Sequence, residues 1–402
     1  MQPYFPDKWV EINLDAVEKN LRTVRSLLAD KTRLIAVIKA DAYGHGAVAT
    51  AQLLAENGVD YFAVSFFREA IQLRQAGITE SILVFSPIIS EYELREAIEN
   101  NLTITIASPY DWQLLDSICA SVNIAIKIHL KVDTGLGRFG LQAKEILTLI
   151  PEMRKESQIN IEGIYTHMAA AASSPTYTRH QFASFMQILY KLEEAGLQLP
   201  LRHCANSAVL LKYPHMQLDA VRVGTLLSGQ APVGTVSADL ELEDPYRFKT
   251  RIISLRKLEK GSYLAYYRSY RLKKAAQLAV IPVGFIDGLA LQVGNKPSGW
   301  MDLLKTVVKL ILLYGNVARF GQQVSIAGTK YPVRGKVFMQ MALVEIPLDR
   351  EVKIGDEVEV PIRKTLTSPD IVRIYLQNGK VVKISTKEGG MNSPVEFLST
   401  KA

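Results

Sequence analysis

The first half of the chain alternates short apolar runs with longer stretches in which apolar positions recur three and four residues apart. Short β-branched runs are typical of buried strands, and the longer spacing is typical of amphipathic helices. Repeated strand and helix units of this kind favour a parallel sheet. Eight runs carry the pattern, and eight units predict a closed (β/α)8 barrel: 34–40, 60–65, 81–86, 102–107, 123–133, 160–169, 201–207 and 220–225.

The pattern changes near residue 243. After the stretch ELEDPYRFKTRIISL, alternating and β-branched runs dominate and helical spacing becomes scarce. We therefore predict an α/β protein with a (β/α)8 barrel domain over residues 1–242, followed by a mostly β C-terminal domain over 243–402. The first 14 or so residues are candidates to join the β domain.

One inserted helix is expected in the β domain, near residues 300–315. The sequence WMDLLKTVVKLILLYG carries a broad apolar face, with Lys305 and Lys309 one turn apart on the opposite side. Two interpretations stay open: a helix packed on the β domain or on a second subunit, or a helix lying in a membrane interface. We expect the first and no membrane contact, because no apolar run reaches the roughly 18 to 20 residues that span a bilayer.

Composition narrows the class of protein. The 402 residues are 48% hydrophobic and 22% charged, which suits a folded chain of enzyme size. The net charge is +7, but Lys and Arg are scattered, so we expect anionic small ligands and no nucleic acid. Cys119 and Cys204 are far apart and show no CxxC spacing, so neither a disulfide framework nor a metal site is indicated. With no signal peptide at the start, we expect a cytoplasmic protein.

Polar side chains gather at the predicted carboxyl ends of the barrel strands. The fold would bring these ends around one mouth, with a phosphate site after strands seven and eight. A lysine, a phosphate cradle and an arginine in one cavity are the parts that hold pyridoxal phosphate as a Schiff base. The residues are Lys39, Arg138, His167, Asn206, Ser207, Arg222 and Gly224.

Each of these residues also has a purely structural explanation. A lysine at a strand end can extend its ammonium to water, although an unpaired ammonium in a dry site is costly. His167 could be a hydrogen-bonded core residue, and Arg222 could pair with a carboxylate. Asn206 and Ser207 could be helix caps. Their combination at one face of the barrel is what favours a functional site.

The motifs resemble those of the alanine racemase family, whose members combine such a barrel with a β domain. VIKADAYGHG is similar to the cofactor-lysine signature of that family, which implies that Lys39 binds pyridoxal phosphate and Tyr43 reaches its phosphate. In LKVDTGLGRFG, Lys131 is a candidate for carbamylation and Arg138 would contact cofactor and substrate carboxylate. The resemblance also implies cofactor contacts for His167, Asn206, Ser207, Arg222 (at the ring nitrogen), Gly224 and Thr225, with His203 near the cofactor.

The resemblance continues into the second domain. SYLAYYRSY implies a catalytic Tyr266, and RGKVFMQM implies that Met339 offers its backbone amide to the substrate carboxylate. The family works as a head-to-tail homodimer, so Lys39 and the partner's Tyr266 would be two bases on opposite faces of the substrate. The implied activity interconverts L- and D-alanine and supplies D-alanine for peptidoglycan. Lowering a tyrosine pKa of about 10 to neutrality takes roughly 4 kcal/mol, for which we expect the cations His167 and Arg222.

The sequence departs from the family pattern around the expected substrate entrance. Tyr267 stands where glycine is usual, Phe285 and Ser228 where tyrosine is usual, and Gln340 where aspartate is usual. Residues 290–320 resemble an insertion. A broader racemase acting on serine, lysine or arginine, or a catalytically silent cofactor-binding relative, therefore stays an alternative. A single-barrel carrier would lack the Tyr266 segment, and a decarboxylase would place an acid where Arg222 stands.

Overall fold

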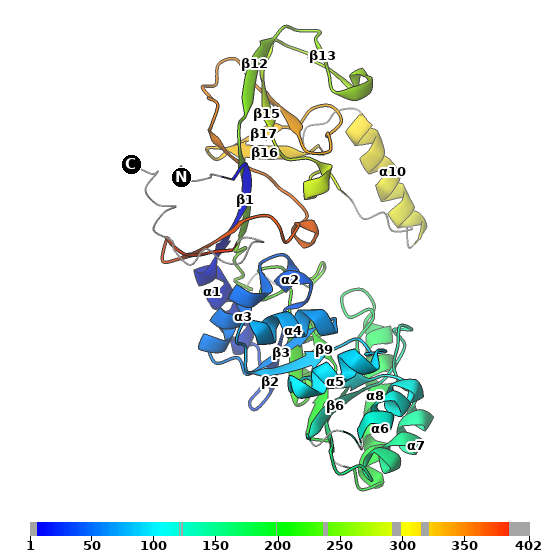
Figure 1. The fold of residues 1–402 in the computed structure, drawn as a ribbon. Coiled ribbons are helices and arrows are strands. Elements are labelled where there is room, and N and C mark those ends of the chain that lie inside the picture. Colours follow the sequence, from blue (N-terminus) through cyan, green and yellow to red (C-terminus); the bar gives the residue numbers. More distant parts are fainter. Residues whose placement is uncertain are drawn as a thin grey trace. The chain divides into compact units, whose positions relative to one another are not determined.

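In the computed structural model, the chain forms two compact units (Figure 1). One comprises Leu14–Pro245, and the other combines Met1–Asn13 with Tyr246–Ala402. The residues whose structure is described are 6–119, 121, 124–197, 199–235, 240–291, 299–314 and 321–385.

Unit Leu14–Pro245 is a nearly closed parallel barrel, as the sequence predicts. Its strands follow the order β8-β7-β6-β5-β4-β3-β2-β10-β9, and every pairing between neighbours is parallel. A buried cluster that includes Ile35, Tyr61 and Leu83 fills part of its interior. The strands are β2 (Arg33–Val37), β3 (Tyr61–Val64), β4 (Ser81–Val84), β5 (Thr103–Ile106), β6 (Ile126–Lys131), β7 (Ile159–Tyr165), β8 (Leu201–His203), β9 (Ala205–Asn206) and β10 (Ala220–Val223).

The seventh predicted run forms two strands instead of one. β8 pairs with β7, whereas β9 pairs with β10, and only Cys204 lies between them. The run therefore changes partner at Cys204, which is how the sheet comes close to closing on itself. This change depends on long-range pairing, so the apolar pattern alone could not reveal it.

Helices follow the strands and cover the barrel (Figure 1). α1 shows why these segments form helices that pack on the barrel: Val17, Leu21 and Val24 recur at helical spacing and lie buried on one face. α8 begins where the Ser174 hydroxyl accepts a hydrogen bond from the Tyr177 amide, and Pro175 opens its first turn. The helices are α1 (Leu14–Ser26), α2 (Lys39–Tyr43), α3 (Ala47–Glu56), α4 (Phe67–Gln75), α5 (Glu91–Glu99), α6 (Pro109–Cys119), α7 (Ala143–Met153), α8 (Pro175–Glu194) and α9 (Ser207–Lys212).

The second unit is mostly β. Strand β1 (Lys8–Asn13), from the start of the chain, pairs antiparallel with β11 and parallel with β20, so the chain enters this unit before it builds the barrel. A seven-stranded sheet runs β17-β16-β19-β11-β1-β20-β21, beside sheets β12-β15-β18 and β13-β14. The bounds are β11 (Tyr246–Arg251), β12 (Ser254–Leu258), β13 (Tyr263–Leu264), β14 (Tyr270–Arg271), β15 (Ala276–Ile281), β16 (Gln323–Ile326), β17 (Thr329–Pro332), β18 (Ala342–Ile346), β19 (Glu357–Glu359), β20 (Arg373–Gln377) and β21 (Lys380–Ser385).

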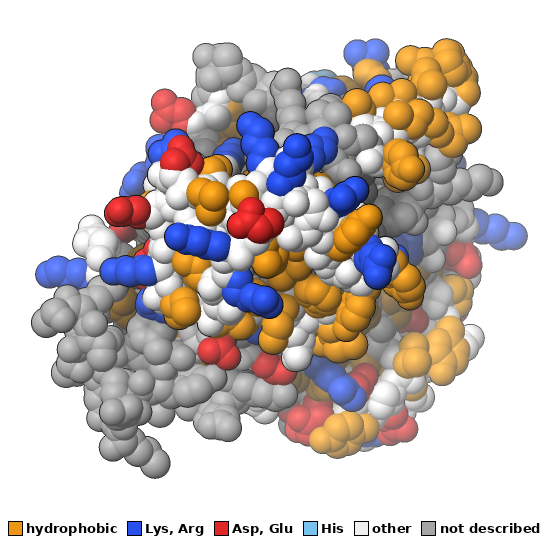
Figure 2. Space-filling view, turned by 90° about the horizontal axis from the view of Figure 1, so that it is seen from above, with side chains coloured by type: hydrophobic (Ala, Val, Ile, Leu, Met, Phe, Trp, Pro, Cys, Tyr) orange, Lys and Arg blue, Asp and Glu red, His pale blue; other side chains and the backbone are white. Residues whose placement is uncertain are grey.

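The inserted helix is present as α10 (Trp300–Tyr314). Its apolar side chains from Trp300 to Ile311, and Tyr314, are 42% to 91% exposed. Figure 2 shows hydrophobic side chains exposed beside Lys and Arg on the face that it views. These apolar side chains are therefore little covered by the described part of the chain, and packing of this helix on the β domain or on a second subunit stays a prediction. No helix among the described residues is long and apolar enough to cross a membrane. Parts of the insertion expected at 290–320 lie outside the described residues.

Candidate active site

Lys39 stands at the carboxyl end of β2, where it opens a left-handed turn. Ala40, Asp41, Ala42 and Tyr43 all have positive φ angles between 50° and 57°. A left-handed conformation costs roughly 1–2 kcal/mol per non-glycine residue, so neighbouring groups have to hold this turn in place. The sequence predicts a turn here, but Ala and Tyr give no signal of its handedness.

Side chains on both sides of the turn fix it. The Glu69 carboxylate accepts hydrogen bonds from the amides of Ala40 (2.6 Å) and Ser65 (2.8 Å), which ties the turn to α4 and to the end of β3. The Asp41 carboxylate accepts from the Ala47 amide at 2.7 Å, at the start of α3. These bonds satisfy backbone groups that the left-handed turn would otherwise leave unpaired, and they hold Lys39 at the barrel mouth.

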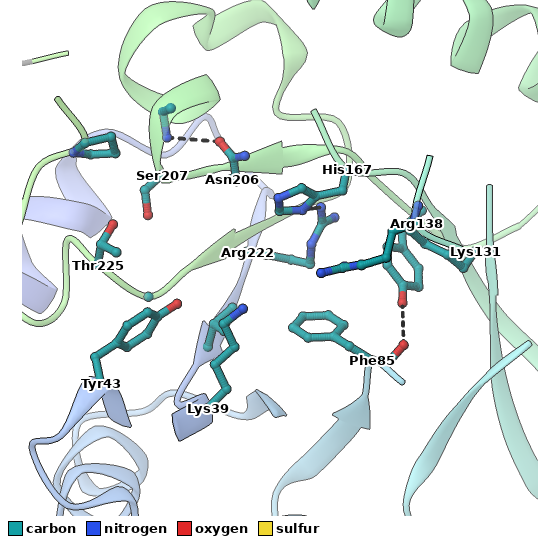
Figure 3. A pocket seen from close by; sticks show the side chains of 15 residues that line it. Lys39, Tyr43, Phe85, Lys131, Arg138, His167, Asn206, Ser207, Arg222 and Thr225 are labelled. Carbon is teal, nitrogen blue, oxygen red and sulfur yellow. Dashed lines mark hydrogen bonds between the residues drawn. The ribbon is translucent and has the colours of Figure 1, made fainter. Parts of the chain in front are cut away.

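Lys39 contributes its amine to a cavity of about 320 Å³ at this mouth (Figure 3). Burial, and then the nearby charge of Arg138, lower the pKa of Lys39, while Glu69 opposes the shift. The described residues that line the cavity include several basic side chains and no carboxylate, so the cavity suits an anionic ligand. They are Val37, Lys39, Tyr43, Phe85, Lys131, Arg138, Tyr165, His167, Asn206, Ser207, Ala208, Arg222, Gly224, Thr225 and Pro232.

Hydroxyl groups gather at one end of the cavity. Tyr43, Ser207 and Thr225 lie together there in Figure 3. Burial raises the pKa of Tyr43 to about 12, so its phenol stays protonated and can donate a hydrogen bond. Gly224 makes room for that phenol, because a Cβ on Gly224 would lie 2.6 Å from Cε2 of Tyr43. Neutral donors and a bare backbone are what a bound phosphate needs.

Basic side chains lie at the opposite end of the cavity. Burial, and then the charge of Arg222, lower the pKa of Lys131 to about 7, and its Nζ donates to the Val132 carbonyl at 2.6 Å. Burial and Arg222 also lower the pKa of His167 to about 3, so this imidazole is neutral at physiological pH. The expectation that His167 is a cation is therefore wrong: desolvation and neighbouring positive charge outweigh its basicity.

Arg222 lies beneath the cavity on β10. Its Nη2 donates to the Thr166 carbonyl at 2.7 Å, and its Nη1 donates to Nδ1 of His203 at 2.8 Å. Burial lowers the pKa of Arg222 to about 10, which still leaves the guanidinium charged at neutral pH. His203, expected beside the cofactor, does not line the cavity and lies fully buried behind Arg222.

The structure brings the predicted barrel residues together, whereas Tyr266 and Met339 belong to the other unit. Asn206 also caps α9, where its side-chain oxygen accepts from the amides of Ala208 and Val209. Tyr266 is 65% exposed, with its ring edge-to-face on Phe338 at 5.1 Å, and Met339 is 58% exposed. Sequence reasoning missed Phe85, which lies near the end of the predicted run 81–86, and Tyr165, which ends strand β7 but lies inside the predicted run 160–169, so only Phe85 had a signal in the sequence.

A nearly closed parallel barrel with its polar residues at the carboxyl strand ends defines the (β/α)8-barrel enzymes. The sequence model of the family "alanine racemase, N-terminal domain" matches residues 12–232. The model of the family "alanine racemase, C-terminal domain" matches residues 246–373. The chain therefore belongs to the alanine racemase family.

Individual relatives agree with this assignment. Alanine racemase 1 of Oceanobacillus iheyensis is 33% identical over 376 residues, covering 92% of this chain and 89% of the relative. Alanine racemase 1 of Caldanaerobacter subterraneus is 35% identical over 357 residues, covering 87% of this chain and 84% of the relative. The solved alanine racemase of Clostridium difficile 630 superposes with a TM-score of 0.83 at 30% identity, covering 96% of this chain and 99% of that one.

Proposed function

We propose that the protein is a pyridoxal-phosphate-dependent racemase that interconverts L- and D-alanine. The observation that carries this proposal is the Lys39 amine, whose pKa is lowered by burial, in a cavity whose described lining holds basic side chains and hydroxyls but no carboxylate. Family membership over both domains supports the same activity. We infer a cytoplasmic homodimer whose product D-alanine serves peptidoglycan synthesis.

The residues present fit pyridoxal phosphate. Lys39 would hold its aldehyde carbon, while Tyr43, Ser207, Thr225 and the backbone at Gly224 would hold its phosphate. Asn206, His167 and Arg222 would border the ring. The bare Gly224 backbone supports this fit, because a side chain there would collide with Tyr43. When bound, the cofactor withdraws electrons from the substrate α-carbon and makes its proton removable.

Inverting the α-carbon requires a proton to leave one face and another to arrive on the opposite face. Lys39 would exchange the proton on one face, since its lowered pKa leaves more of the amine neutral at physiological pH. The partner subunit's Tyr266 would exchange it on the other. An exposed phenol, 65% accessible in the described chain, supports this second role.

Arg222 would bias the chemistry toward proton return. A guanidinium has only donors, so it can donate to a ring nitrogen but cannot keep that nitrogen protonated as an accepting carboxylate would. By leaving the ring nitrogen unprotonated, Arg222 would favour prompt return of the proton to the α-carbon, and therefore racemisation over side reactions.

Arg138 and the backbone amide of Met339 would bind the substrate carboxylate. Among the described residues, no hydrogen bond uses the Met339 amide, which leaves this donor open to a ligand. Lys131 has a pKa of about 7, so a large fraction of its amine is neutral and able to attack carbon dioxide. Carbamylation would form a C–N bond and release a proton, placing a negative charge near Arg138 and Arg222.

Borohydride reduction tests the proposal directly. Protein saturated with pyridoxal phosphate should be yellow, and reduction followed by peptide mapping should place the label on Lys39. A chiral product assay over a panel of L-amino acids should then show alanine inverted fastest, and Tyr266→Phe should remove inversion while keeping the label.

Three results would count against the proposal. A label on another side chain, or no chromophore, would exclude Lys39 as the cofactor lysine. Much faster inversion of lysine or arginine would replace alanine as the substrate.

A further inference from the structure

Arg222 is a buried cation, and no carboxylate among the described residues forms a hydrogen bond with it. Its side chain is 4% exposed, and its charge helps to lower the pKa of the nearby Lys131 amine. Its described acceptors are the carbonyls of Thr166, His203 and Cys204 and the imidazoles of His203 and His167, all of them neutral. Buried charges are normally paired, so the compensating anion must be sought further away.

A chain of hydrogen bonds leads from Arg222 through the barrel interior to such an anion. Nη1 of Arg222 lies 2.8 Å from Nδ1 of His203, and Nε2 of His203 lies 2.9 Å from Nδ1 of His129. Nε2 of His129 lies 3.0 Å from Oε2 of Glu162. These four residues are called the histidine relay below. The histidines are fully buried.

The direction of every bond in the histidine relay follows from Arg222. Because a guanidinium can only donate, Nδ1 of His203 must accept, and the single proton of the neutral imidazole sits on Nε2. That proton is donated to Nδ1 of His129, whose own proton therefore sits on Nε2 and is donated to Glu162. Burial lowers the pKa of both histidines, so both rings are neutral at physiological pH.

Glu162 ends the histidine relay as a carboxylate. Burial opposes its ionisation, but hydrogen bonds from His129 and Tyr61 lower the pKa of Glu162 to about 2. Thr103 also donates to Oε2, at 3.3 Å. The anion is thus well held on β7, and its position is set by residues that do not touch the cavity.

Packing leaves the imidazoles little freedom to turn. A Cβ on Gly163 would lie 2.9 Å from Cε1 of His129 and 2.6 Å from the Leu201 carbonyl oxygen, so only glycine fits beside that ring. The Tyr165 ring stacks on His203 with an interplanar angle of 12° and a centroid distance of 5.0 Å. The rings are therefore held in the one arrangement that the donor directions require.

We propose that Glu162, acting through His129 and His203, is a positioning residue for Arg222. Its charge polarises both imidazoles so that Nδ1 of His203 is a strong acceptor, which anchors Nη1 of the guanidinium. In the described structure the hydrogen bonds of Arg222 use Nη1 and Nη2, so Nε–H stays outside this network as a donor for the cavity. The catalytic consequence rests on the proposed function, in which Arg222 faces the cofactor ring nitrogen.

Solid-state NMR of protein with 15N-labelled histidine and bound pyridoxal phosphate tests the histidine relay without an activity measurement. The chain has six histidines, which keeps the spectrum assignable. We expect His129 and His203 to be neutral and protonated only at Nε2. A proton on Nδ1 of either ring, or a charged ring, would overturn the proposal whether or not the protein is a racemase, and this measurement needs no variant.

Glu162→Gln then separates positioning from packing, because it removes the charge and keeps the shape. We expect the His203 Nδ1 signal to move toward that of an unbonded nitrogen and kcat to fall about tenfold, with KM nearly unchanged, as when a charged hydrogen-bond partner is lost. Thr103→Val, which removes one donor to Glu162 but keeps the carboxylate, should change both readouts little. The proposal fails if the two variants shift the His203 signal equally.

Discussion

At the scale of single residues, the missing side chain of Gly224 leaves room for the Tyr43 phenol in the cavity. Because a Cβ at this position would lie 2.6 Å from Cε2 of Tyr43, Gly224→Ala should displace the phenol from the hydroxyl end of the cavity. We expect pyridoxal phosphate to bind about tenfold more weakly, which is the loss of roughly one hydrogen bond to a charged group. A fluorescence titration with the cofactor measures this change.

Gly299→Ala is the matched control for that prediction, since nothing lies within 4 Å of a Cβ there. It should leave the affinity for the cofactor unchanged. Equal affinities for both variants and the unaltered protein would show that Tyr43 does not need its present position.

Two features of single residues in the site could not be predicted from the sequence. The apolar run before Lys39 and the glycines after it predicted a strand end and a turn. They could not predict positive φ angles at four consecutive non-glycine residues, because that conformation depends on Glu69 of α4 and on the bond from Asp41 to the Ala47 amide of α3. The neutral state of His167 was missed for the same reason: it depends on burial and on Arg222, neither of which is local in sequence.

At the scale of elements, the period of the apolar pattern predicted the barrel well because parallel strands buried on both faces form continuous apolar runs. The change of partner at Cys204 and the pairing of β1 with β20 join segments that are distant in sequence, so no local pattern encodes them. The amphipathic pattern of α10 predicted a helix correctly, but it could not tell whether its apolar face is covered.

The exposure of α10 has a measurable consequence for stability. Leu310 is 59% exposed, whereas Leu278 on β15 is 7% exposed within the core of the β unit. For a helix as exposed as it is in the described chain, we expect Leu310→Gln to change the free energy of unfolding by less than about 0.5 kcal/mol and Leu278→Gln to lower it by about 3 kcal/mol, whereas packing on a second subunit would make the Leu310→Gln loss large. Urea denaturation of the two variants provides the comparison, and a large loss for Leu310→Gln would mean that the helix is covered in solution.

At the scale of the whole molecule, the chain forms two units, and every residue that lines the cavity lies in Leu14–Pro245. A ligand that binds only the folded state stabilises the unit that binds it, by about 2.7 kcal/mol at one hundred times its dissociation constant. We therefore expect pyridoxal phosphate to stabilise the barrel unit directly and to leave the β unit nearly unchanged.

The three tryptophans allow each unit to be followed separately. Trp112 is 3% exposed in the barrel unit, and Trp9 is 1% exposed in the β unit. One variant keeps Trp112 alone, after Trp9→Phe and Trp300→Phe, and the other keeps Trp9 alone, after Trp112→Phe and Trp300→Phe. Each variant is denatured in urea with and without cofactor, and its tryptophan fluorescence is followed. The cofactor should raise the urea concentration at the midpoint of unfolding only for the variant that keeps Trp112. Equal shifts would show that the two units unfold as one cooperative body, because stabilisation confined to one unit cannot otherwise reach the other.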